Sequence, residues 1–267
     1  RLKEAFPQHD YEIVIIKTTG DIDTTRPLDQ IGSKGIFVDQ IEASLLSGDI
    51  QLAVHSMKDM PDSPLEGLVF TKSWERADAR DLLILKEGNT YMDLPANATV
   101  ATGSKRRSFQ LLKLRPDINI VPIRGNIDTR INKLFDESQH LDAIVLAAAG
   151  VERLDIRLDH SYLFEASEMV PAPAQGTLAI EANINNKKII EMVDSLANQE
   201  ADTITRIERG FLKAIGGDCH LPVGALAYKK GAIYTLDALF GNEDGSKLAF
   251  ATVSSINPDE LISQAVA

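Results

Sequence analysis

The chain has 267 residues, of which 44% are hydrophobic, and a formal net charge of −11 at pH 7. This length predicts two or three domains with ample buried core. The acidic balance excludes a general binder of nucleic acid or of anionic membrane surfaces. Any anionic partner must therefore be recognised by a local cluster of cations that works against the overall field.

Cellular location is constrained by the cysteine count and by the opening segment. The single cysteine, Cys219, rules out an internal disulfide and favours a reducing compartment. No apolar run approaches the roughly 20 residues of a membrane span. The opening RLKEAFPQHD is not a signal peptide and looks like the tail of a helix, which suggests an incomplete N-terminus. We expect a cytoplasmic protein.

Strand-like and helix-like segments alternate over the first two thirds of the chain. A β-rich run at 11–18 is followed by a helical pattern at 35–49 that ends near Gly48. Further strands are expected at 50–56, 65–70, 81–86, 99–103, 118–123 and 141–150. Helices are expected to begin within 102–108 and 124–135. This rhythm predicts parallel sheets covered by helices.

The rhythm changes after about residue 200. Residues 202–215 form one amphipathic helical pattern, and a last helix begins within 257–267. Between them, three β-rich runs are joined by the turn sequences KKG and GNEDG, and they cover residues 223–228, 232–240 and 248–255. The pattern predicts a small α+β domain with antiparallel strands.

The helix within 102–114 begins with an unfavourable arrangement of charge. Lys105, Arg106 and Arg107 occupy its first turn, where the helix dipole is already positive. Such repulsion costs about 0.3–1 kcal/mol for each exposed charge. We interpret Arg106 and Arg107 as facing an anionic ligand, and Lys105 as solvated.

Cations recur where the expected strands end. Any one of them is most simply a solvated surface residue, but that explanation weakens for a group of six. They are Lys58, Arg106, Arg107, Arg124, Arg130 and Arg153. Ligands of open α/β sheets bind beyond the carboxyl ends of strands, and arginine binds carboxylates and phosphates through paired N–H groups. The group predicts a small ligand with several carboxylates or phosphates.

Two further residues have both an ordinary and a chemical interpretation. Asp59 is either a charge-balancing turn residue before Pro61 or a proton donor and acceptor. Cys219 is either a buried small side chain or, in the polar turn GGDCHLPVG, a chemically used thiol. His220 is discounted as its catalytic partner, because adjacent side chains seldom point at each other. The histidine spacing and the single cysteine predict no metal site.

Six motifs occur in an order that resembles the porphobilinogen deaminase (hydroxymethylbilane synthase) family. They are HSMKDMP, ATGSKRRSFQLLKLRPDI, IRGNIDTRINKL, LAAAGVERL, AQGTLAIE and GGDCHLPVG. The resemblance implies an α/β fold of two periplasmic-binding-protein-like domains with a central cleft, plus a small α+β C-terminal domain. It implies a first domain at 1–76 and 177–196, a second at 77–176 and a third at 197–267.

The resemblance implies an enzyme of tetrapyrrole (haem, porphyrin) biosynthesis. This transferase would condense four porphobilinogen molecules head to tail, releasing ammonia, into the linear tetrapyrrole hydroxymethylbilane. Its primer would be a dipyrromethane cofactor attached to Cys219 through a thioether. The family expectation is a monomer with a small-molecule substrate and no nucleic-acid or membrane partner.

The resemblance also implies roles for individual residues. Asp59 would be the catalytic carboxylate that helps to protonate the departing amine. The residues expected to bind the cofactor, besides Cys219, are Ser56, Lys58, Thr102, Ser104, Arg106, Arg107, Arg124 and Arg130. Those expected to bind substrate are Arg153, Phe37 and Gln175. No metal is implied.

Some positions depart from the family pattern, and a second class of function stays open. The family's first strand is absent, and substitutions stand at Thr19, Gly103, Lys105, Ala174 and Asp218. The alternative is a non-catalytic two-lobed protein that binds a small polycarboxylate anion. Such a binder would need neither Asp59 nor Cys219.

Overall fold

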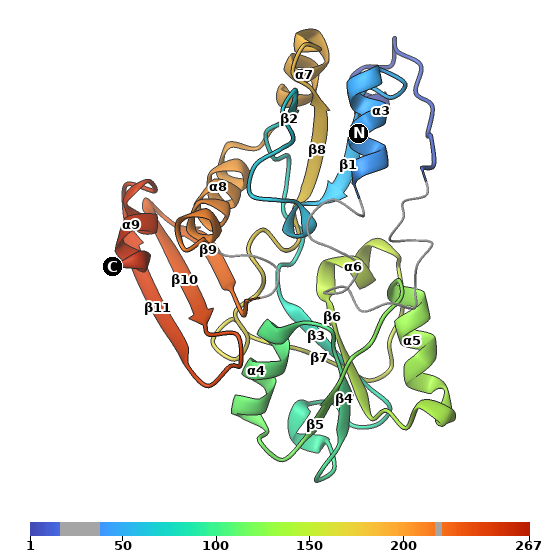
Figure 1. Ribbon diagram of the computed structural model, residues 1–267, viewed down its shortest axis with the longest axis vertical. Helices are drawn as coiled ribbons and strands as arrows, with labels where there is room; N and C mark the ends of the chain where they lie inside the picture. Colours follow the sequence, from blue (N-terminus) through green and yellow to red (C-terminus); the bar gives the residue numbers. More distant parts are fainter. Residues whose placement is uncertain (17–37, 217–220) are drawn as a thin grey trace.

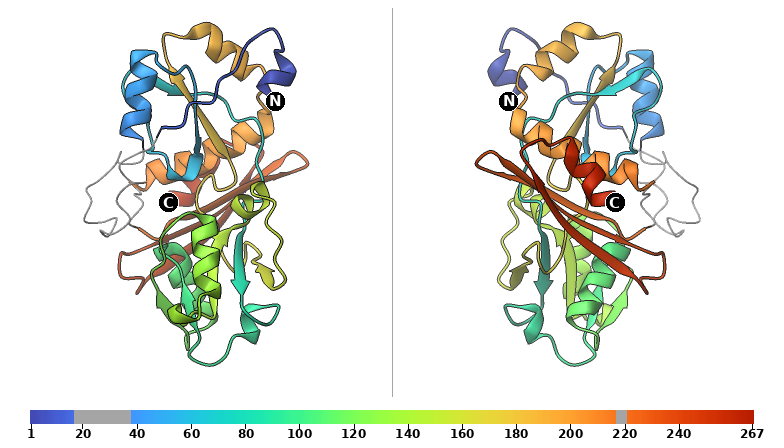
Figure 2. Two further views of the ribbon diagram at one scale, coloured as in Figure 1. Left: turned by 90° about the vertical axis from the view of Figure 1, so that its right-hand side faces the viewer. Right: turned by 90° about the vertical axis from the view of Figure 1, so that its left-hand side faces the viewer.

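The computed structural model describes residues 1–16, 38–216 and 221–267 and contains three β-sheets (Figure 1). One three-stranded sheet and one five-stranded sheet lie at opposite ends of the long axis. The third sheet, from the C-terminal part, runs diagonally across their junction (Figure 2). Phe37 and Cys219, to which the resemblance assigns roles, lie outside the described residues.

The three-stranded sheet at one end, with its helices, is here called the first lobe. Its strands are β1 (Ala53–Ser56), β2 (Leu68–Phe70) and β8 (Leu178–Asn183), and its helices are α3 (Asp39–Ser47) and α7 (Lys187–Asp194). β8 lies between β1 and β2 and is antiparallel to both, so the predicted parallel pairing is wrong here. α3 ends at Gly48 in the left-handed region (φ 85°), as its sequence predicts.

The N-terminal segment differs from its prediction. A short helix, α1 (Leu2–Ala5), precedes it. Of the strand predicted at 11–18, the structure describes residues 11–16, and these form no strand. Ile13 and Ile15 are 90% and 84% exposed, so this apolar pattern is not buried in a sheet.

The five-stranded sheet, with its helices, is here called the second lobe. Its strands are β3 (Asp81–Leu85), β4 (Thr99–Ala101), β5 (Asn119–Val121), β6 (Ala143–Ala147) and β7 (Ser161–Leu163). Its helices are α4 (Lys105–Leu114), α5 (Ile127–Phe135) and α6 (Ala148–Arg153). Short 3-10 turns are η1 (Met57–Asp59), η2 (Tyr91–Asp93) and η3 (Glu137–Gln139), the first of them in the first lobe.

The second-lobe sheet is mixed, with the strand order β5-β4-β6-β3-β7. β4 is parallel to β5 and β6, as predicted, but β3 is antiparallel to β6 and β7. Along β3, Leu83 and Leu85 enter one core cluster and Ile84 enters another. Because both faces are covered, its apolar run is continuous rather than alternating. The strand predicted at 141–150 ends at Ala147 and continues as α6, consistent with the high helix propensity of alanine.

The C-terminal part matches its predicted organisation. It comprises α8 (Gln199–Ala214), β9 (Gly224–Lys230), β10 (Ile233–Gly241), β11 (Leu248–Ser255) and α9 (Glu260–Val266). The antiparallel sheet has the order β11-β10-β9 and packs Leu236 with Phe211 and Leu261. The described residues thus form two α/β units and a small α+β unit, in agreement with the predicted fold class. Among the described residues, no helix has the length and apolar character needed to cross a bilayer.

Two chain segments connect the lobes and are here called the crossings. Residues 71–80 lead from β2 to β3, and residues 164–177 return from β7 to β8. The crossings meet at an antiparallel bridge between Arg76 and Thr177, where the Ala77 amide donates to the Gly176 carbonyl at 3.1 Å. This junction fixes how the chain passes between the lobes.

Gly176 is required by both its backbone conformation and its surroundings. It has a φ of 90°, and an added Cβ would lie 2.5 Å from the Ala77 carbonyl oxygen. We expect Gly176→Ala to destabilise the fold by at least about 2 kcal/mol, because strain and a backbone clash add. Gly231→Ala is the matched control, since Gly231 has a φ of 63° and open space around it. Chemical denaturation should show a clearly larger loss for Gly176→Ala, and equal losses would contradict this assignment.

Candidate active site

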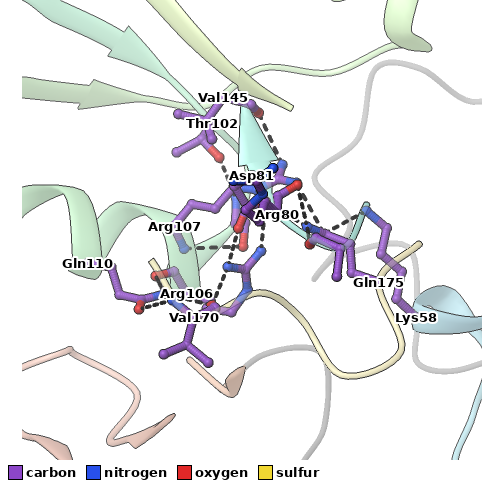
Figure 3. A network of polar contacts seen from close by, with 12 residues as sticks. Lys58, Arg80, Asp81, Thr102, Arg106, Arg107, Gln110, Val145, Val170 and Gln175 are labelled. Carbon is purple, nitrogen blue, oxygen red and sulfur yellow. Dashed lines mark hydrogen bonds and ion pairs between the residues drawn. The ribbon is translucent and has the colours of Figure 1, made fainter. Parts of the chain in front are cut away.

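Asp81, the first residue of β3, is the fully buried centre of a polar network between α4 and the returning crossing (Figure 3). Its carboxylate accepts from Arg106 Nη1 at 2.6 Å and from Arg107 Nε at 2.8 Å. Gln175 Nε2 adds a third donor at 3.0 Å. Burial by itself raises the pKa of Asp81, but the two guanidiniums outweigh it and hold that pKa well below its usual range.

This network explains the cations at the start of α4. Ser104 is the N-cap, and its Oγ accepts from the Arg107 amide at 3.4 Å. Arg106 and Arg107 are only 4% and 6% exposed, and they also donate to the carbonyls of Val170 (2.7 Å) and Val145 (3.0 Å). The expected contact of these two arginines with an anionic ligand stays a prediction, and the structure gives both a buried carboxylate partner.

Lys105 extends in a different direction from its two neighbours. Its Nζ lies 3.0 Å from Glu243 Oε1 in the β10–β11 connection, and its side chain is 40% exposed. The residue interpreted as solvated is thus partly exposed and links α4 to the C-terminal sheet. A surface ion pair of this kind contributes little free energy.

Lys58 approaches the network from the first lobe. It lies in η1, directly after β1, and its Nζ donates to Gln175 Oε1 at 3.3 Å. Burial, and then the like charge of Arg107, lower the pKa of Lys58 to about 8, although Asp59 and Asp81 oppose the change. Near Lys58, the two carboxylates of Asp59 and Asp81 therefore do not fully offset burial and the positive charges of Arg106 and Arg107.

Arg130 on α5 belongs to the same electrostatic group. Asn126 caps this helix, with its Oδ1 accepting from the Thr129 amide at 2.9 Å, and Arg130 Nε donates to the Gly125 carbonyl at 2.7 Å. Burial, and then the like charge of Arg107, lowers the pKa of Arg130, while Asp59 opposes that shift.

The electrostatic group, here called the cation cluster, carries more positive than negative charge. Its cations are Lys58, Arg106, Arg107 and Arg130, and its carboxylates are Asp59 and Asp81. Like charges at close range destabilise one another, and an added anion would relieve that repulsion. The cluster is thus suited chemically to a ligand with carboxylate groups.

The excess charge predicts how stability depends on pH. Lys58 has a folded pKa near 8 and an ordinary pKa of 10.5, so the unfolded chain binds its proton more tightly. The free energy of unfolding of the ligand-free protein, relative to Lys58→Met, should therefore increase by about 1–3 kcal/mol as pH rises from 8 to 10.5. Urea titrations at several pH values measure this difference. A difference that stays constant or falls over that interval would contradict it.

Asp59 is exposed at the end of η1, where its turn is held from the C-terminal part. Arg209 of α8 donates to the Met60 carbonyl at 2.8 Å and to the Pro61 carbonyl. The backbone around Asp59 is thereby fixed without using its carboxylate. An exposed carboxylate beside several cations is suited to exchange protons with a bound molecule.

The other predicted site residues lie around this cluster in different environments. Thr102 is buried, and its Oγ1 accepts from the Ser104 amide at 3.3 Å. Ser56 is exposed at the end of β1, and Arg124 is half-buried in the connection before α5. Arg153, at the end of α6, donates to the Gly176 carbonyl at 2.7 Å. This bond brings Arg153 onto the returning crossing.

Sequence reasoning missed the acidic partners that hold these parts together. Asp81 was seen only as the start of a strand, and Glu208 only as part of a helix. Glu208 is fully buried, forms a two-point ion pair with Arg76, and accepts from the amides of Ala174 and Ala227, each at 2.6 Å. It thereby joins both crossings to the C-terminal part. For Asp81 the available signal was its position directly before the apolar run LLIL, whereas Glu208, between Ile207 and Arg209, gave none.

Comparisons with known proteins agree along most of the chain. Residues 1–191 match the family described as "Porphobilinogen deaminase, dipyromethane cofactor binding domain", and residues 203–266 match "Porphobilinogen deaminase, C-terminal domain". Porphobilinogen deaminase of Lachnospira eligens is 47% identical, covering 98% of this chain and 89% of the relative. That of Clostridioides difficile is 46% identical, covering 97% and 87%.

Solved structures with similarity to the chain are more distant. A probable amino-acid ABC transporter extracellular-binding protein from Bacillus subtilis is 14% identical, with a TM-score of 0.41 over 66% of this chain and 75% of that one. A periplasmic binding protein from Salmonella typhimurium with high arginine specificity is also 14% identical, with a TM-score of 0.37 over 60% and 70%.

Proposed function

The chain belongs to the porphobilinogen deaminase family, and on that premise we propose how its residues divide the work of the reaction. It is a transferase that condenses four porphobilinogen molecules head to tail into hydroxymethylbilane and releases one ammonia at each condensation. It uses a dipyrromethane cofactor. The non-catalytic alternative is not favoured, because the curated relatives are porphobilinogen deaminases.

The observation that carries the proposal is the excess positive charge of the cation cluster. A dipyrromethane, like porphobilinogen, has acetate and propionate side chains, so it would bring several carboxylates to a site with four cations and two acids. The residues of the cluster fit such a group. When bound, it supplies the free pyrrole position to which the first substrate is joined.

We propose that Lys58 and Arg130 are the main residues that bind the carboxylates of the cofactor and the substrate. Their pKa values are lowered by burial and by the like charge of Arg107, so a bound carboxylate would stabilise the charged form of each. Arg106 and Arg107 would contribute mainly through their field, because Asp81 already occupies donors of both guanidiniums. Ser56, Thr102, Ser104, Arg124 and Arg153 remain proposed contacts at the edges of the site.

Asp59 would move the proton in each condensation. The carbon–nitrogen bond of porphobilinogen breaks, its amine leaves as ammonia, a new carbon–carbon bond forms, and a proton is lost from the pyrrole carbon. Asp59 can donate the proton to the leaving amine and later accept the one released from carbon, so it ends each cycle unchanged. Its exposed position within the electrostatic reach of Lys58 and Arg130 supports this role.

The finer organisation is also part of the proposal. We propose domains at 1–76 with 177–196, at 77–176 and at 197–267, supported by one sheet in each. Cys219 would carry the cofactor, and Phe37 would contact substrate. We further propose a cytoplasmic monomer without a nucleic-acid or membrane partner, in keeping with the net charge of −11.

Turnover provides the direct test of this function. The purified protein should consume porphobilinogen and release one ammonia for each molecule consumed, and its product should be the linear tetrapyrrole. Cys219→Ser is the matched control, and it should bind substrate without sustained turnover. Consumption of porphobilinogen without ammonia release, or full activity of Cys219→Ser, would contradict the proposal.

A further inference from the structure

Gln175 connects the two lobes through its side-chain amide (Figure 3). It is 0% exposed and lies on the returning crossing. Its Oε1 accepts from Lys58 Nζ of the first lobe at 3.3 Å and from Arg107 Nη2 of the second lobe at 3.4 Å. Its Nε2 donates to Asp81 Oδ1 at 3.0 Å and to the Ala79 carbonyl at 2.7 Å. Donors and acceptors from both lobes thus converge on one side chain.

The backbone of Gln175 is fixed independently of this amide. Its carbonyl accepts from Arg76 Nε at 3.0 Å, and its amide nitrogen donates to the Ala172 carbonyl at 2.9 Å. The preceding residue, Ala174, donates to the buried Glu208. The side chain therefore starts from a defined point, and its length and polarity determine where Lys58 and Arg107 meet.

The contacts of Gln175 require one acceptor and one donor, which an amide supplies in a single planar group. A glutamate would place negative oxygen against Asp81 and the Ala79 carbonyl. An apolar side chain of the same length would leave the part-buried Lys58 ammonium without this acceptor. Neither substitute provides the hydrogen bonds that Gln175 makes to both lobes.

We propose that Gln175 is a positioning residue that holds Lys58 of the first lobe at a fixed place against Arg107 and Asp81 of the second. This differs from the substrate contact that the sequence suggests for Gln175. The Gln175 amide is fully buried, and its donors and acceptor are bonded inside the protein. It would therefore act on a ligand indirectly, by holding Lys58 in place. Only the kinetic part of its test rests on the proposed function.

The titration of Lys58 measures this coupling directly. NMR of protein labelled at lysine ¹³Cε reports the charge of Lys58, and Lys58→Met identifies the signal. Within residues 1–16, 38–216 and 221–267, the charged groups that face Lys58 are Arg106 and Arg107 of α4, Asp59 of η1 and Asp81 of β3. Gln175→Met removes an acceptor and should lower the pKa of Lys58, whereas Gln175→Glu adds a negative charge and should raise it. Shifts in opposite directions are the expected result.

Gln110, a buried amide of α4 that bonds to the returning crossing but has no bond to Lys58, offers a matched control. It is 2% exposed, and its amide accepts from the Val170 nitrogen at 2.8 Å and donates to the Val170 carbonyl at 3.1 Å. Gln110→Met should destabilise the protein to a similar degree and leave the Lys58 titration as in wild type. Hydrogen exchange in the crossing of residues 71–80 should accelerate in Gln175→Met but not in Gln110→Met, because Gln110 contacts the other crossing, through Val170.

Kinetics complete the test in the holoenzyme. Gln175→Met should lower kcat/KM for porphobilinogen by roughly 10- to 100-fold, since hydrogen bonds to charged groups are lost. An unchanged Lys58 titration in both Gln175 variants, or shifts of the same sign, would overturn the proposal. If Gln175→Met does not fold, Gln175→Glu still tests the proposal by itself. The proposal predicts that the pKa of Lys58 rises in this variant, and an unchanged or lowered pKa would overturn it. An inactive wild type with the expected titrations would instead count against the proposed function.

Discussion

Replacing Asp81 with asparagine should lower the free energy of unfolding by about 3–5 kcal/mol, the usual consequence of removing one partner from a buried ion pair. The carboxylate is fully buried and accepts from Arg106, Arg107 and Gln175. Its loss leaves two buried guanidiniums without their counter-ion. Urea or guanidinium denaturation of the purified variant measures the change.

Asp117→Asn is the matched control for Asp81→Asn. Asp117 also pairs with an arginine, Arg115, at 2.7 Å, but its side chain is 39% exposed. Solvent screens such a pair, so its loss should change stability far less. Similar losses for the two variants would show that the buried network is not the main determinant of stability in the second lobe.

Lowering the pH should remove the contribution of the Asp81 carboxylate to the free energy of unfolding without a mutation. Its folded pKa is depressed below the unfolded value near 3.9, so its stabilising effect is complete above about pH 4 and is lost as pH falls further. The stability difference between wild type and Asp81→Asn should therefore narrow below pH 4. A difference that stays constant down to pH 2 would contradict this account of Asp81.

Replacing Asp59 with asparagine should lower kcat by about 10²- to 10⁴-fold, the range expected when a general acid and base is lost. Asp59 is exposed, and its turn is held by Arg209 through the backbone carbonyls of Met60 and Pro61. The fold and the melting temperature should therefore change little. Steady-state rates of porphobilinogen consumption, measured on protein whose intact mass shows the cofactor, test this expectation.

Asp62→Asn is the control for Asp59→Asn. Asp62 is an exposed acid three residues further along the same loop, so it reproduces the change in net charge. It should retain nearly wild-type kcat. Retention of most activity in Asp59→Asn, or an equal loss in both variants, would remove Asp59 from its proposed role.

Much of the fold follows from local sequence patterns. The helix stop at Gly48, the apolar run of β3 and the antiparallel strands β9 to β11 were predicted because each depends on residues close in the chain. Strand direction was predicted less well, since β3 and β8 pair antiparallel to neighbours far away in sequence. A short apolar run does not encode which neighbour it will pair with.

In the site, too, features that depend on local sequence were predicted and contacts between distant residues were not. Cations at the start of α4 and after β1 were found from their positions, but their partners were not. Asp81 lies 25 residues before Arg106, and Glu243 lies 138 residues after Lys105. These pairs form only when the sheet and the C-terminal part fold against α4. Local sequence therefore indicated an anion site. The structure shows in addition that the buried Asp81 already neutralises part of the positive charge of Arg106 and Arg107.

We propose that this chain builds its product on a dipyrromethane bound to Cys219. The most direct measurement is the intact mass of protein made in cells that produce porphobilinogen, followed by peptide mapping. A covalent dipyrromethane should add about 420 Da, located on the peptide that contains Cys219. Cys219→Ser should have its unmodified mass. A wild-type protein that turns over porphobilinogen but carries no added mass, or carries it on another residue, would contradict the claim.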